Sequence, residues 1–198
     1  MRILGISGSL RSESYNTRLL RGLRGALPPG VELVLFEGLR AIPPFSEDDE
    51  DSPPQSVEAL KQAIADADAV LISTPEYNGS IPGQLKNALD WASRPRAEAP
   101  VVGKPVAVIG ASPGLFGAVW AQADTRKVLG LMGAAVIDRE LPVGGADEAL
   151  DETGQLRDED VRAELLSIVT ELVDHAARAR EGAGGSARAP GAQQALTA

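Results

Sequence analysis

ILGISGSLRSESYNT, residues 3–17, decides the fold of this chain. It begins with a short apolar run, Ile3 to Ile6, which predicts a buried strand, and it continues into a loop rich in Gly and Ser. After the loop, apolar residues recur at helical spacing, at Leu19, Leu20, Leu23 and Leu27. A buried strand, a polar loop and an amphipathic helix in this order predict one βα unit of a parallel sheet.

The same alternation recurs along the rest of the chain. Further apolar runs predict strands at residues 31–36, 69–72, 106–109 and 134–137. Helical spacing of apolar residues follows some of them, at Val57, Leu60 and Ile64 and again at Val161, Leu165, Ile168 and Leu172. Strands that are almost entirely apolar are typical of a sheet covered on both faces. We therefore expect an α/β fold with a doubly wound, five-stranded parallel sheet and a ligand site beyond the carboxyl ends of its strands.

Composition limits what the chain can do. Its 198 residues suit one domain, expected over residues 1–180, and a flexible tail rich in Gly, Ala, Ser and Gln over 181–198. The absence of cysteine excludes disulfides, thiolate metal sites and Cys nucleophiles. A formal net charge of −9 disfavours nucleic acid and anionic membranes as partners. Met1 and Arg2 lead directly into a strand-like run, so we expect a cytoplasmic protein.

The loop over residues 8–17 has the donors that a phosphate needs. It supplies hydroxyls, the guanidinium of Arg11 and backbone N–H groups, and the helix after it adds the positive end of its dipole. Ser14 or Asn16 can also cap that helix, which is compatible with phosphate binding. The loop lacks both the Walker A pattern and Gly-x-Gly-x-x-Gly. These absences favour a mononucleotide over a nucleoside triphosphate or a dinucleotide in a Rossmann crevice.

The loop over residues 73–83 predicts a wall for a flat ring. Two prolines and two glycines give it an irregular path, which leaves backbone N–H groups unpaired. A flavin ring accepts hydrogen bonds along its edge, and Tyr77 is placed to pack beside it. Alternatively, the loop is a structural turn with Tyr77 packed on the core. Residues 110–117, after the fourth predicted strand, supply a third wall rich in Gly and Ser.

Two motifs resemble the NAD(P)H-dependent FMN reductase family, a flavodoxin-like group that includes quinone, azo-dye and chromate reductases. One is Gly8-Ser9-Leu10-Arg11-x-x-Ser14-x-Asn16, and the other runs from Pro75-Glu76-Tyr77-Asn78-Gly79 to Asp90-Trp91. The resemblance implies the strand order 2-1-3-4-5, bound FMN, and a homodimer or homotetramer. It implies phosphate contacts from Ser9, Arg11, Ser14, Tyr15 and Asn16, and ring contacts from Pro75, Glu76, Tyr77, Asn78, Gly79, Ser112 and Gly114.

The implied activity is an oxidoreductase that takes hydride from NADPH or NADH. It passes two electrons to flavin, quinone, azo or oxyanion acceptors. No catalytic side chain is expected, because FMN supplies the chemistry. The alternatives are a flavodoxin-type one-electron carrier between protein partners and a flavin-less binding or regulatory protein. No second phosphate-binding cluster is evident in the sequence, so the preferred donor stays open.

Three further features have weaker implications. Trp120 stands where the family often has arginine, and it is either an interface residue or part of the core. The acidic run at residues 47–51 predicts a solvated loop rather than a cation site. His175 is expected at a helix surface or end, and no metal site is predicted.

Overall fold

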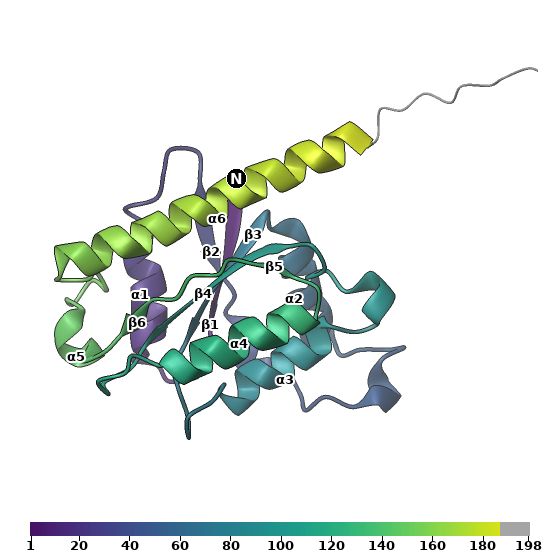
Figure 1. Cartoon of the computed structure of the whole chain (residues 1–198). Helices are drawn as coiled ribbons and strands as arrows, with labels where there is room; N and C mark the ends of the chain where they lie inside the picture. Colours follow the sequence, from purple (N-terminus) through teal and green to yellow (C-terminus); the bar gives the residue numbers. More distant parts are fainter. Residues whose placement is uncertain (187–198) are drawn as a thin grey trace, which may run out of the picture.

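The computed structural model describes residues 1–186 as a parallel sheet with helices on both faces (Figure 1). Its strands are β1 (Arg2–Ser7), β2 (Glu32–Leu35), β3 (Ala69–Thr74), β4 (Pro105–Ala111), β5 (Ala135–Val136) and β6 (Pro142–Val143). They follow the order β2-β1-β3-β4-β5, and every pairing between these strands is parallel. The predicted α/β class and flavodoxin-like strand order are confirmed.

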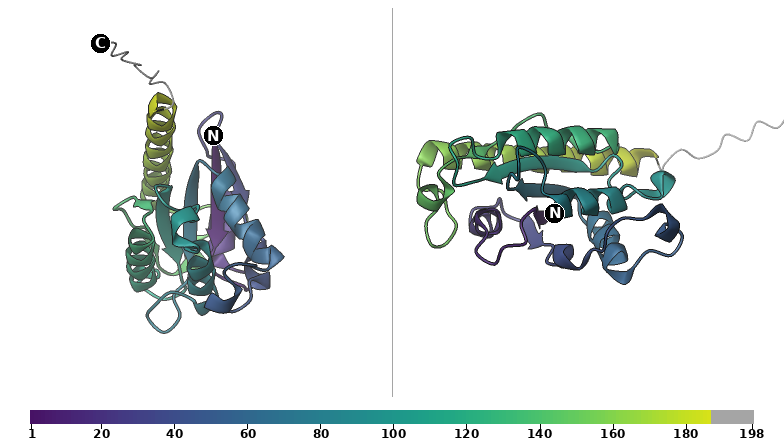
Figure 2. Two further views of the ribbon diagram at one scale, coloured as in Figure 1. Left: turned by 90° about the vertical axis from the view of Figure 1, so that its right-hand side faces the viewer. Right: turned by 90° about the horizontal axis from the view of Figure 1, so that it is seen from below.

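The helices form two layers, as the end-on views in Figure 2 show. They are α1 (Tyr15–Leu23), α2 (Gln55–Asp66), α3 (Gly83–Ala92), α4 (Val119–Leu131), α5 (Ala146–Ala149) and α6 (Glu159–Ser186), with 3-10 helices η1 (Gly38–Ala41), η2 (Glu47–Asp49) and η3 (Arg96–Glu98). Apolar residues of α1 and α6 pack on one face of the sheet. Those of α2, α3 and α4 pack on the other. Every residue of β3 and β4 is buried, because both faces of these central strands are covered.

The fifth strand position differs from the prediction. A single strand was expected over residues 134–137, but β5 has only two residues, and the chain pairs with β4 again as β6. Between the two strands, Arg139 bonds to α6 and Glu140 pairs with Arg126 of α4 at 2.9 Å. These polar contacts take the backbone off the sheet edge, and β6 then extends the sheet at the carboxyl end of β4.

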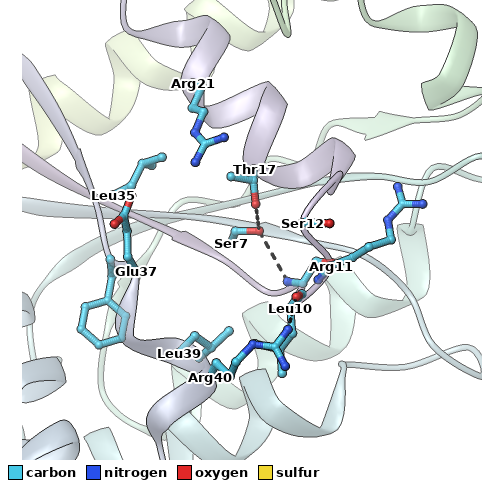
Figure 3. A pocket seen from close by; sticks show the side chains of 12 residues that line it. Ser7, Leu10, Arg11, Ser12, Thr17, Arg21, Leu35, Glu37, Leu39 and Arg40 are labelled. Atoms are coloured by element: carbon cyan, nitrogen blue, oxygen red, sulfur yellow. Dashed lines mark hydrogen bonds between the residues drawn. The ribbon is translucent and has the colours of Figure 1, made fainter.

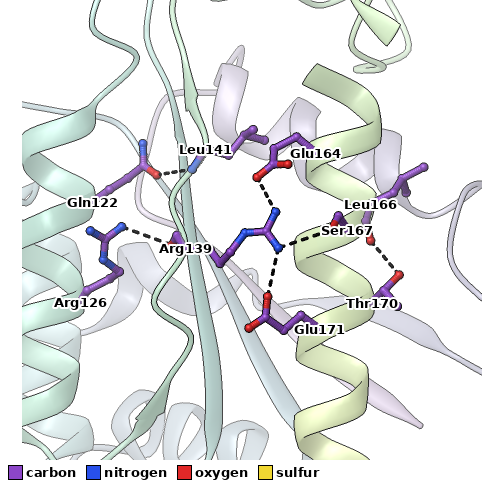
Figure 4. Close-up of polar contacts among 9 residues, drawn as sticks. All are labelled: Gln122, Arg126, Arg139, Leu141, Glu164, Leu166, Ser167, Thr170 and Glu171. Atoms are coloured by element: carbon purple, nitrogen blue, oxygen red, sulfur yellow. Dashed lines mark hydrogen bonds and ion pairs between the residues drawn. The ribbon is translucent and has the colours of Figure 1, made fainter. Parts of the chain in front are cut away.

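Polar side chains fix the segment between β5 and β6 (Figure 4). Arg139 from this segment bonds to Ser167, Glu164 and Glu171, all on α6. On the other side, the buried amide of Gln122 accepts the N–H of Leu141 at 3.0 Å and donates to the carbonyl of Gly117 at 3.1 Å. The loop before α4 and the segment before β6 therefore hold each other in place.

The last helix, α6, is described as far as Ser186 and so includes residues 181–186 of the predicted tail. The remainder of the predicted tail, residues 187–198, lies outside the described residues. Of the helices within residues 1–186, none combines the length and the apolar character that crossing a bilayer requires.

Candidate functional site

Three loops meet where the central strands end. The register pairs Ser7 of β1 with Ser73 of β3, and Thr74 of β3 with Gly110 of β4. Because the strands are parallel and in step, the loops after β1, β3 and β4 leave the sheet side by side. This is the edge at which the sequence predicted a ligand site.

A pocket of about 290 Å³ opens between these loops. This volume is at the lower end of the range for small-molecule sites. Nine of the twelve predicted site residues line it: Ser9, Arg11, Ser14, Tyr15, Asn16, Pro75, Glu76, Tyr77 and Ser112. Ala111 and Pro113 line it as well and were not predicted. Asn78, Gly79 and Gly114 lie in the same loops but do not line the pocket.

The side chain of Asn16 joins the start of α1 to two strands of the sheet. It is buried and donates from Nδ2 to the carbonyl of Ala111 at 2.9 Å. Its Oδ1 accepts the N–H of Ala111 at 3.0 Å and the hydroxyl of Ser73 at 2.8 Å. These bonds join the start of α1 to the ends of β3 and β4. Both acceptor positions of Oδ1 and one N–H of Nδ2 are therefore used by protein groups, and the backbone N–H of Asn16 has no hydrogen-bond partner within residues 1–186.

The first turn of α1 offers hydrogen-bond donors to the pocket. Ser14 caps the helix, with its hydroxyl accepting the N–H of Thr17 at 3.3 Å. Within residues 1–186, the backbone N–H groups of Tyr15 and Asn16 have no hydrogen-bond partner. The guanidinium of Arg11 lies 4.8 Å from the centre of the Tyr15 ring and bonds to the carbonyl of Glu13 at 2.6 Å. A capped helix start with free donors and an arginine fits an anionic group such as a phosphate.

The loop after β3 presents Tyr77 through a tight turn. Asn78 and Gly79 both have positive φ, 55° and 72°, which is typical of a two-residue hairpin turn. Tyr77 and Ser80 flank the turn and exchange backbone hydrogen bonds of 3.1 and 3.2 Å. The turn leaves the Tyr77 side chain 51% exposed at the pocket. An aromatic side chain held by a rigid turn suits contact with a flat ring.

Glu76 links two of the three loops. Its Oε2 accepts the N–H groups of Trp120 and Ala121, at 3.0 and 3.1 Å. These are first-turn donors of α4, whose N-cap residue Ala118 has no side chain able to accept them. A carboxylate at a helix N-terminus also interacts favourably with the helix dipole. Glu76 therefore caps α4 from the neighbouring loop and fixes the distance between two walls of the pocket.

The loop after β4 forms the third wall. Ser112 donates its N–H to the carbonyl of Val143 at 3.0 Å, so this loop is held by β6. Gly114 lies on the far side, where its carbonyl accepts the N–H of Gly145 at 3.3 Å. Ala111 lines the pocket as the last residue of β4, and a buried strand residue of this kind carries no polar signal in a sequence.

Comparison with known proteins agrees with this geometry. Residues 1–148 match the model of a family described as NADPH-dependent FMN reductase. An NAD(P)H-dependent FMN reductase of Pseudomonas aeruginosa is 43% identical over 164 residues, which cover 82% of this chain and 88% of that protein. A 2-hydroxy-1,4-benzoquinone reductase of a Burkholderia species is 39% identical, covering 85% and 92%. The structure of FerB, a flavoenzyme NAD(P)H:(acceptor) oxidoreductase of Paracoccus denitrificans, superposes with a TM-score of 0.78 at 36% identity, covering 89% of this chain and 97% of that one.

Replacing Asn16 by alanine tests the structural role of its amide. Asn16→Ala removes three hydrogen bonds and leaves buried polar groups of Ala111 and Ser73 without partners. We expect the free energy of unfolding to fall by about 2–3 kcal/mol, measured by urea denaturation without added cofactor. Ser73→Ala removes only one of these bonds and should cost about 1 kcal/mol. Equal losses from the two substitutions would contradict the assignment.

Proposed function

This chain belongs to the NADPH-dependent FMN reductase family, and on that premise we propose which residues hold FMN and how they serve the reaction. The activity is the two-electron reduction of flavin and quinone acceptors by NAD(P)H, with FMN as the cofactor. One observation supports the site: the capped start of α1 and the side chain of Tyr77, which come from two different loops, line the same pocket.

The FMN phosphate binds at the α1 end of the pocket in this proposal. The backbone N–H groups of Tyr15 and Asn16 donate to it, and Arg11 supplies the compensating positive charge. Ser9 and Ser14 line the same end. The hydroxyl of Ser14 already caps α1, so its contribution to the phosphate is to hold the donors of the first turn in place.

The flavin ring lies beside the loop over residues 75–79, with Ser112 on the opposite wall. When bound, FMN accepts a hydride from the nicotinamide donor and passes two electrons to the acceptor. The backbone N–H group of Glu76, which lines the pocket, has no hydrogen-bond partner within residues 1–186, so it remains available to the ring edge. Donors fixed in position before the reaction stabilise negative charge on the reduced ring without reorganising.

The protein contributes position rather than acid–base chemistry. Among the residues lining the pocket, the carboxylate is that of Glu76, and it is bonded to the start of α4. We propose that donor and acceptor occupy the same open space in turn. We extend the proposed acceptors to azo compounds and metal oxyanions, because an open site without a dedicated acid or base imposes little chemical selection on them.

Reduction of the bound flavin by nicotinamide tests the function directly. The purified protein, loaded with FMN and mixed anaerobically with NADPH or NADH, should lose the visible absorbance of oxidised flavin. Addition of a benzoquinone should restore it with one quinone consumed per donor oxidised. Retention of the oxidised spectrum with both donors would contradict the proposal.

We also propose that the protein forms a homo-oligomer and works in the cytoplasm, where its nicotinamide donor is produced. An aromatic patch made of Phe116 and Trp120 supports the oligomer. These side chains are 59% and 50% exposed, and their rings lie 5.0 Å apart. Exposure of Trp120 excludes it from the core of this chain. A second copy covering the patch would bury it beside the flavin pocket.

A charge placed in the aromatic patch should separate the subunits. We expect Trp120→Glu to shift the mass measured by light scattering toward that of a single 20.6 kDa chain. Val102→Glu is the matched control, because Val102 is 57% exposed but precedes β4 at the opposite edge of the sheet. A wild-type protein that is already monomeric at micromolar concentration would overturn the oligomer proposal, as would an unchanged mass for Trp120→Glu.

A further inference from the structure

The turn that carries Tyr77, residues 76–80, is fixed to α4 at both of its ends. At one end, the carboxylate of Glu76 caps the first turn of α4. At the other end, the hydroxyl of Ser80 donates to Oδ2 of Asp124 at 2.6 Å. Asp124 lies on α4 about one helical turn after the N–H groups that Glu76 caps. Two side-chain contacts with one helix therefore hold the turn in place.

The contact between Ser80 and Asp124 is a short one between partly buried groups. Its length lies in the range of about 2.5–2.7 Å that is typical of a hydroxyl donating to a carboxylate, which is a strong hydrogen bond. Within residues 1–186 the carboxylate of Asp124 forms no ion pair, and its hydrogen bond is the one from Ser80. Partial burial of an unpaired carboxylate costs desolvation free energy, which this bond offsets.

The position of Tyr77 depends on this contact. Tyr77 and Ser80 exchange backbone hydrogen bonds of 3.1 and 3.2 Å, which close the turn around Asn78 and Gly79. These bonds hold Tyr77 against Ser80 but do not hold either residue against the rest of the molecule. The Tyr77 side chain is 51% exposed, so core packing does not fix it either. A displacement of Ser80 from α4 therefore moves Tyr77 as well.

The opposite end of the flavin pocket is anchored independently of α4. There the loop after β1 borders a second pocket of about 320 Å³ (Figure 3). The hydroxyl of Thr17 bonds to that of Ser7 at 2.8 Å, and Arg40 of η1 donates to the carbonyl of Leu10 at 2.5 Å. A change at Asp124 is therefore expected to act on the ring side of the flavin pocket and to leave the phosphate side as it is.

We propose that Asp124 is a positioning residue for the flavin. Through Ser80 it holds the turn over residues 76–80 so that Tyr77 and the N–H of Glu76 face the ring. Asp124 does not itself line the flavin pocket, so it acts through Ser80 rather than on the ring. The inference rests on the proposed function, because the turn has this task only if the flavin ring lies beside it.

Flavin binding tests the role of Asp124. Titration of FMN-free protein with FMN, followed by flavin fluorescence, gives both Kd and the brightness of the bound cofactor. Because an aromatic ring in contact with a flavin quenches its fluorescence, the wild-type protein should bind FMN with strong quenching. Asp124→Ala and Ser80→Ala should each raise Kd about fivefold, the equivalent of one hydrogen bond, and leave the bound flavin brighter. Unchanged Kd and brightness in both variants would overturn the proposal.

Three further variants separate position from charge and from a general disturbance of α4. Asp124→Asn removes the charge but keeps an oxygen that can accept from Ser80, so Kd should stay within about twofold of the wild-type value. The double variant of Ser80→Ala and Asp124→Ala should match either single one, because both remove the same bond. Lys127→Ala is the matched control, since Lys127 is exposed on α4 and lines neither pocket. Losses as large with Asp124→Asn as with Asp124→Ala, or additive losses in the double variant, would contradict the positioning role.

The same samples distinguish failure of this inference from failure of the function on which it rests. If the wild-type protein binds FMN and NADPH or NADH reduces it, while Asp124→Ala behaves identically, only the role of Asp124 is wrong. A wild-type protein that binds no FMN contradicts the function itself.

Discussion

The buried amide of Asn16 is the contact on which the geometry of the flavin site depends. It joins the first turn of α1 to Ser73 and Ala111, the residues at which β3 and β4 end. One side chain thereby holds the start of α1 against β3 and β4, the strands that the other two loops follow. The start of α1 is also where the backbone N–H groups of Tyr15 and Asn16 have no partner within residues 1–186. Each of its hydrogen bonds is shielded from water, so loss of the amide leaves polar groups unpaired in the core.

Glu76 likewise joins separate elements, the loop after β3 and the start of α4. Its carboxylate caps α4 and so connects the loop after β3 to the start of the helix that follows the loop after β4. Gln122 then links α4 to the segment that becomes β6. The three loops are held by side chains that do not depend on a bound ligand, and a site built in this way loses little conformational entropy when FMN enters. This preorganisation explains how a pocket made mainly of loops can hold a cofactor.

Much of this architecture could be predicted from local sequence. Apolar runs marked the central strands, and the loop composition marked the edge where the pocket opens, because both signals depend on neighbouring residues. The role of Asn16 could not be predicted in this way, since its partners lie 57 and 95 residues away. The division of the fifth strand into the short β5 and β6 was not predicted either. The segment between them is held by ion pairs of Arg139 and Glu140 with α6 and α4, which are distant in the sequence.

The position of FMN tests the central claim most directly. A crystal structure of the FMN-loaded protein should place the phosphate within hydrogen-bond distance of the backbone N–H groups of Tyr15 and Asn16. The flavin ring should lie beside Tyr77 and the backbone of residues 75–79. An FMN phosphate bound away from the first turn of α1, or a flavin ring away from Tyr77, would contradict the account.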